Sequence, residues 1–204
     1  MASYDIKPTA LNRLERYGAI IVLCLLGFRF LFGVGLDFFL LTAITIMAVF
    51  YLWFGFFLFN NAVPLDLLDR RKLVGYTPFR TVSSILMGMV YSLCLIAILY
   101  AVFFYTRMQF MLGFSVFLLG VSTTLILIYH WFNRTDSAFL GQYYRRTAIL
   151  GAFIIGLTFT PVDTRLKLLY AEFPGFIEAY REYRENPDSE QALEQLRSER
   201  SKFR

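Results

Sequence analysis

The position of Arg29 points most directly to a chemical role. Arg29 is the one fully charged residue within five long apolar segments, which are residues 17–35, 38–59, 81–105, 109–132 and 147–160. An arginine within such a segment costs roughly 2.5–3.5 kcal/mol on insertion scales, and such residues are often functional. Two alternatives stay open. Arg29 either reaches the interface or pairs with Asp37, or it contacts a partner helix or the headgroup of an anionic lipid.

The segment 38–59 carries a cluster of aromatic residues on every side of its expected helix. The members near its end are Phe50, Tyr51, Trp53, Phe54, Phe56, Phe57 and Phe59. A helix that is apolar all round is surrounded by apolar material. Two alternatives stay open: the aromatic residues contact membrane lipid, or they line a groove that holds a quinone or an acyl chain. We therefore take Arg29, Trp53 and Phe56 as the candidate contact for a lipid or a partner.

The remaining reactive residue types do not form a recognisable catalytic or metal-binding set. His130 is the only histidine, and Cys24 and Cys94 lie on different apolar segments. A zinc site needs three or four ligands, and a haem held by two histidines needs a second histidine. Apart from Asp37, the apolar segments and their tight turns offer no acid or base beside a nucleophile. We expect no catalytic residue, metal or cofactor, and lean against an enzyme.

Composition and charge spacing indicate an all-α integral membrane protein. Of the 204 residues, 57% are apolar, and the mean hydropathy is +0.55. Uncharged stretches of 28, 26 and 26 residues separate Asp37 from Asp66, Arg80 from Arg107, and Arg107 from Arg134. A spanning helix needs roughly 20 predominantly apolar residues. The net charge of +5 lies in short connections, so that no nucleic-acid surface is expected.

The lengths of the connections predict two transmembrane helical hairpins followed by a short fifth segment. The turns after residues 35 and 105 are too short for anything but antiparallel neighbours. Between the hairpins, Asp66 and Arg70 are spaced to face each other on a short surface helix. The segment 147–160 covers about 21 Å of a core roughly 30 Å thick, which leaves open whether it crosses.

The basic residues predict that the N-terminus is cytoplasmic, because cytoplasmic loops hold the excess of Lys and Arg. Arg107 stands alone in the two tight turns. The opposite side collects Lys7, Arg13, Arg16, Arg70, Arg71, Lys72, Arg80, Arg134, Arg145 and Arg146. The expected organisation is a cytoplasmic segment at 1–16, a bundle at 17–160 and a helical tail at 161–204, and the expected location is a bacterial inner membrane.

Small residues recur at helical spacing on two of the apolar segments. They are Ser84, Gly88 and Ser92 on one segment, and Ala148, Ala152 and Gly156 on the other. Such stripes let helix backbones approach closely in a membrane. They pack either within the chain or against another subunit.

The tail begins after Pro161 and predicts two short amphipathic helices. The apolar face of the first is formed by Phe176, Ile177, Tyr180 and Tyr183. About 30 residues cannot bury a core of their own, so we expect this face to dock on a partner or on membrane-proximal loops. Asp188, with Gln191 three residues later, is expected to cap the second helix.

The leading functional hypothesis is a non-catalytic structural or assembly subunit of a multi-subunit membrane complex. Its expected partners are membrane lipids and other membrane subunits. The alternative hypothesis is a lipid-binding or lipid-modifying membrane protein that uses Arg29 and the aromatic groove.

Overall fold

The computed structural model describes residues 9–65, 77–132 and 137–202. Within these ranges the chain is all-helical, with eight α-helices, the short 3-10 helix η1 and no strand. The predicted surface helix at Asp66 and Arg70 lies outside the described residues. The helices are α1 (Ala10–Phe32), η1 (Gly33–Leu36), α2 (Asp37–Asn60), α4 (Pro78–Val102), α5 (Met108–Phe132), α6 (Ser137–Phe159), α7 (Val162–Leu169), α8 (Pro174–Glu185) and α9 (Glu190–Ser201).

Two compact units make up the chain. The first, called the bundle unit below, comprises Met1–Leu23 and Leu41–Phe159. The second, called the tail unit, comprises Cys24–Leu40 and Thr160–Arg204. Because the division falls within α1 and α2, the end of α1 and the start of α2 belong with the tail unit.

In the part of the chain that the structure describes, three helices, α2, α4 and α5, are long and apolar enough to cross a membrane. The helices α6 and α7 meet the same length and hydropathy test only together, as a pair bent by 103°. If this pair is one span, it is the fourth candidate. These helices indicate a membrane protein.

Two helices begin well before the apolar segments that they contain. The helix α1 starts at Ala10, ahead of the apolar segment 17–35, and α6 starts at Ser137, ten residues ahead of the segment 147–160. Arg145 and Arg146 therefore lie inside a helix of 23 residues and not in a connection. Arg146 can lie inside this helix because its charge is paired within the bundle unit, as described below.

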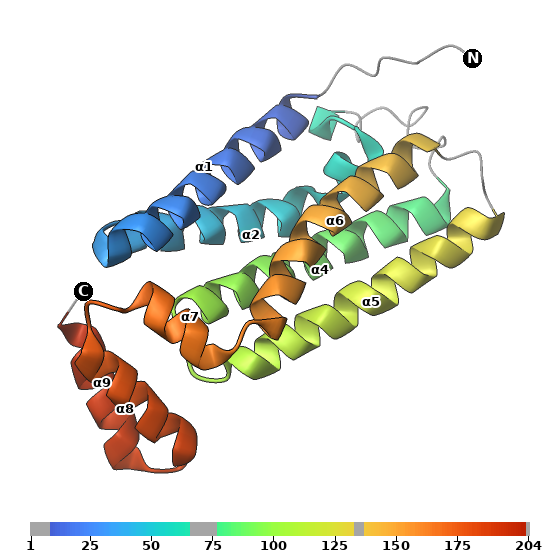
Figure 1. Cartoon of the computed structure of the whole chain (residues 1–204). Helices are drawn as coiled ribbons and strands as arrows, with labels where there is room; N and C mark the ends of the chain where they lie inside the picture. The colour runs from blue at the N-terminus through green and yellow to red at the C-terminus, as the bar shows by residue number, and fades with distance from the viewer. Residues whose placement is uncertain (1–8, 66–76, 133–136, 203–204) are drawn as a thin grey trace. The chain divides into compact units, whose positions relative to one another are not determined.

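In the bundle unit, α4 packs against both α5 and α6, and α5 packs against α6 (Figure 1). The helix α4 begins after Thr77, whose side chain accepts a hydrogen bond from the backbone N–H of Arg80, and Pro78 occupies its first turn. Proline suits this position because the first N–H groups of a helix have no partner within it. The buried face of α4 includes Ser84, Gly88 and Ser92.

The helices α2 and α4 meet at a pair of glycines. A Cβ atom on Gly88 would lie 2.5 Å from the carbonyl oxygen of Tyr51 and 2.9 Å from the Cα of Gly55. A Cβ on Gly55 would lie 2.6 Å from the Cα of Gly88. Since backbone atoms are in contact, a larger residue fits at neither position without moving a helix. The stripe on α4 therefore packs within the chain.

Replacing Gly88 by alanine is expected to destabilise the bundle unit by about 1–3 kcal/mol, the usual cost of forcing an extra methyl group into a packed contact. Cys94 is buried in this unit, and the other thiol, Cys24, is exposed. In a Cys24→Ser background, thermal exposure of Cys94 to a maleimide dye reports the unfolding. Gly113→Ala is the control, because a Cβ there meets nothing within 4 Å. Equal midpoints for the two variants would contradict the close contact.

In the tail unit, α8 packs against α9 (Figure 1). Phe176 is fully buried, with its ring centroid 4.5 Å from that of Tyr170, and the guanidinium of Arg200 lies 5.8 Å from the Phe176 ring centroid. Burial also raises the pKa of Tyr180. Further buried apolar residues of this small core include Leu166, Leu169, Ala179, Ala192 and Leu196.

Polar contacts order the ends of the tail helices. Asp163 of α7 accepts hydrogen bonds from Arg181 at 3.1 Å and Arg184 at 3.2 Å, both on α8. The helix α9 is capped by Ser189, whose hydroxyl accepts from the N–H of Ala192 at 3.3 Å. The prediction that Asp188 caps this helix was wrong by one residue. Asp and Ser are both favoured at the N-cap, so the residue types alone did not distinguish Asp188 from Ser189.

Candidate functional site

A buried ion pair joins the first and last helices of the bundle unit. Arg146 of α6 is 4% exposed and Glu15 of α1 is 7% exposed. The Nε of Arg146 donates to Oε1 of Glu15 at 2.5 Å, and its Nη2 donates to Oε2 at 2.5 Å. This two-point geometry is the strongest arrangement of a guanidinium and a carboxylate. The pair therefore lets both charges lie inside an apolar bundle.

Three further polar residues complete the hydrogen bonding of this pair. The phenol of Tyr51, on α2, donates to Oε1 of Glu15 at 2.6 Å. Arg146 also donates to the side-chain oxygens of Gln142 at 2.7 Å and Asn12 at 3.1 Å. Every nitrogen of the guanidinium thus has an acceptor, and α1, α2 and α6 are tied together at one point. We call these five residues the Glu15–Arg146 network.

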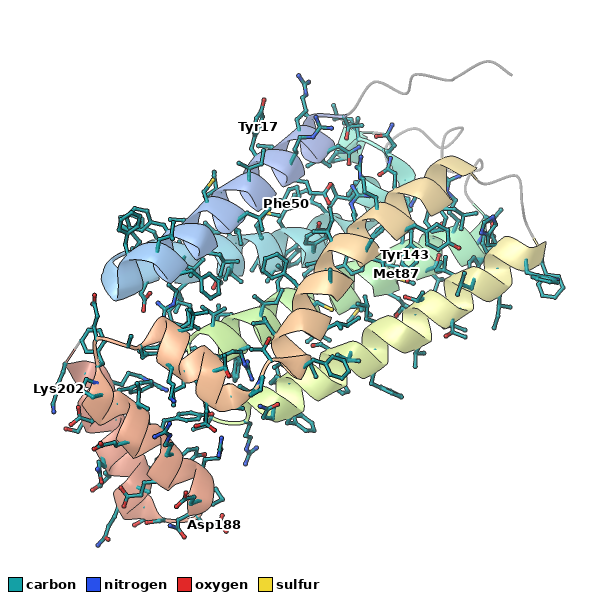
Figure 2. The ribbon with its side chains drawn as sticks, in the orientation of Figure 1. Tyr17, Phe50, Met87, Tyr143, Asp188 and Lys202 are labelled. Carbon is teal, nitrogen blue, oxygen red and sulfur yellow. The ribbon has the colours of Figure 1, made fainter. Side chains whose placement is uncertain are left out.

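Buried tyrosines extend from the network into the bundle. The ring of Tyr91, on α4, lies 5.6 Å from that of Tyr51, and its hydroxyl is 2.5 Å from the hydroxyl of Thr147. Tyr143 is fully buried within the bundle unit (Figure 2). Its hydroxyl is 2.9 Å from that of Thr123 on α5. Each phenol therefore finds a partner on a neighbouring helix, as buried tyrosines normally do.

A second polar contact fixes the start of α4 against the end of α2. The side-chain amide of Asn60 donates to the hydroxyl of Ser84 at 2.8 Å, and its oxygen accepts from Nε of Arg80 at 2.7 Å. Arg80 also lies 5.5 Å from the ring centroid of Phe139. His130, near the end of α5, has its Nδ1 3.1 Å from the hydroxyl of Tyr144.

In the tail unit, Arg29 is 1% exposed and forms an ion pair with Asp37. Its Nη2 donates to the hydroxyl of Tyr170 at 2.8 Å, and its guanidinium lies 5.2 Å from the Tyr170 ring centroid. The pairing with Asp37 is one of the alternatives that the sequence left open. The contact with Tyr170 could not be read from the sequence, since 141 residues separate the two. A contact between Arg29 and a lipid stays a prediction.

The other predicted site residues are divided between the interior and the surface. Trp53 is 73% exposed and Phe56 is half-buried. In the tail, Phe176 and Tyr180 are buried, whereas Ile177 and Tyr183 are half-buried. Docking of this face on another protein stays a prediction.

Glu15, Tyr51 and Arg146 were missed as site residues. A signal was present for Glu15, because it shares one helical face with Val22 and Leu26, which are buried as well. A charge that continues an apolar stripe is expected to have a buried partner. Nothing in the sequence identified that partner as Arg146, which lies 131 residues away.

The chemistry of the network is that of ion pairing and helix attachment. Both oxygens of Glu15 accept hydrogen bonds from Arg146, and one also accepts from Tyr51. Within the described ranges, no group of three or more His, Cys, Asp or Glu residues is placed to hold a metal ion. No family model, curated protein or solved structure showed a match to this chain.

Proposed function

We propose that the chain is a non-catalytic subunit that packs against a helix of another membrane protein through an exposed face of α6. One observation carries the proposal. Two stripes of small residues share the same spacing, and the stripe on α4 is buried against α2 at Gly88. On α6 the stripe formed by Ala148, Ala152 and Gly156 is exposed. Small residues let a second helix approach closely where lipid gives no hydrophobic driving force.

The test is recovery of partners from mild detergent extracts of the native membrane. Ala148→Leu with Ala152→Leu is expected to reduce the recovered partners severalfold, because the added side chains separate the helix backbones. Val121→Leu, which enlarges an exposed residue of α5, is the matched control. A wild-type chain that elutes alone, or full recovery with the α6 variant, would refute the proposal.

The lipid-handling alternative used Arg29, Trp53 and Phe56. Arg29 is engaged with Asp37 and Tyr170, and Trp53 belongs to the bundle unit. No observation brings the three residues to one groove, so this alternative is not developed further.

We further propose that α1 and α6 cross the membrane together with α2, α4 and α5, with the N-terminus in the cytoplasm. Each of α1 and α6 is a helix of 23 residues, and the part beyond Arg16 or Arg146 carries no charge except Arg29. Reporters fused after Asp69, Thr106, Ser137 and Lys202 are expected to be cytoplasmic, extracytoplasmic, cytoplasmic and extracytoplasmic. An extracytoplasmic reporter at Asp69 would reverse the orientation, and a cytoplasmic one at Lys202 would exclude a crossing by α6.

A further inference from the structure

Three exposed arginines flank the Glu15–Arg146 network. Arg13 and Arg16 lie on α1, and Arg145 lies on α6. Each directly follows or precedes a residue of the network, whose bonds run from Asn12 and Glu15 to Arg146. The network therefore holds the exposed arginines of the two helices at the same level of the bundle unit.

On α1 and α6, that level coincides with the start of the exposed apolar residues. On α1, the exposed apolar residues begin at Leu14 and continue with Tyr17, which is 62% exposed and points away from the helix, and Ile20 (Figure 2). On α6, the exposed apolar residue Ile149 follows Arg145 by one turn. Basic and aromatic residues at such an edge lie at the depth of the lipid headgroups.

The charge at this level is positive. Glu15 is the only acidic residue in α1, and α6 contains none. Because both oxygens of Glu15 are bound to Arg146, its charge is already balanced inside the unit. The three exposed guanidinium groups thus present a positive surface to the surroundings of the two helices.

We propose that Arg13, Arg16 and Arg145 bind the phosphate groups of anionic phospholipids in the leaflet around this end of the bundle unit. A guanidinium presents two parallel N–H donors that match the oxygens of a phosphate. Anionic lipid surfaces attract such residues, and each arginine adds to the attraction. The Glu15–Arg146 network positions the two helices so that their arginines act on one ring of headgroups.

The experiment compares lipid binding to the full chain in detergent by native mass spectrometry. Phosphatidylglycerol and phosphatidylcholine are titrated in parallel onto the wild type and onto the triple variant Arg13→Gln, Arg16→Gln and Arg145→Gln. The wild type is expected to prefer phosphatidylglycerol. In the triple variant, the ratio of the affinities for phosphatidylglycerol and phosphatidylcholine should fall on the order of tenfold or more. Unchanged protection of Cys94 shows that the bundle unit of the variant is folded.

Arg107→Gln serves as the control for losing a basic residue elsewhere, since Arg107 lies in the turn between α4 and α5. It is expected to keep the preference for phosphatidylglycerol. The proposal is overturned if the triple variant keeps the preference or if Arg107→Gln loses it equally. It is also overturned if inorganic phosphate at millimolar concentration displaces the lipid, or if a co-purified acidic protein occupies the surface instead.

Discussion

Arg146→Met is expected to destabilise the bundle unit by about 3–5 kcal/mol, because Glu15 is then left as a buried charge without its main partner. Methionine keeps the length and apolar stem of the side chain, so the loss arises from the missing charge. The midpoint of Cys94 exposure to the maleimide dye measures the effect in a Cys24→Ser background. Arg197→Gln, which removes an exposed arginine of α9, is expected to leave the midpoint unchanged.

A double-mutant cycle separates the ion pair from the packing of the two side chains. Glu15→Gln alone leaves Arg146 as a buried charge, and is also destabilising. The combination of Glu15→Gln with Arg146→Met removes both charges, and we expect it to cost clearly less than the sum of the single variants. Strict additivity would show that the two residues do not interact as the structure indicates.

Phe176→Ala is expected to destabilise the tail unit by about 3–5 kcal/mol, the usual cost of removing a buried phenylalanine. The fully buried ring fills the space beside Tyr170, and alanine leaves a cavity there. Opening of α8 and α9 exposes arginines to trypsin. When opening and closing are faster than cleavage, the cleavage rate is proportional to the population of the open form. The rate of tail cleavage should therefore rise on the order of a hundredfold.

Two further variants test whether the faster cleavage is caused by the cavity that Phe176→Ala creates. Phe176→Leu keeps most of the buried volume and should accelerate cleavage only slightly. Leu168→Ala shortens an exposed side chain of α7, and its cleavage rate should match that of the wild type. The dye midpoint of Cys94 should stay unchanged in all three variants, since Cys94 belongs to the bundle unit. Tail cleavage of Phe176→Ala at the wild-type rate would contradict the buried position of the ring.

The sequence predicted the helices that avoid charge more completely than those that carry it. The long uncharged stretches identified α2, α4 and α5, because a helix without charges needs no partner to enter an apolar environment. The same criterion marked only the uncharged parts of α1 and α6, which begin after Glu15 and Arg146. Their mutual bonding removes the cost of burying each charge, and such pairing between distant residues leaves no mark in local composition.

The candidate site was predictable only where its contacts are local. Arg29 and Asp37 are eight residues apart, and their pairing was one of the stated alternatives. The small-residue stripes were recognised by spacing, but spacing alone did not tell which stripe is buried. That distinction depends on Gly55, which meets Gly88 from another helix.

The Glu15–Arg146 pair has a consequence for the order in which the chain is built. Arg146 follows Glu15 by 131 residues, and a ribosome adds about 5–20 residues per second. The carboxylate is therefore synthesised on the order of ten seconds before its guanidinium. During biosynthesis Glu15 of α1 therefore has no Arg146 to pair with until α6 has been translated, and the ion pair of the bundle unit forms only then.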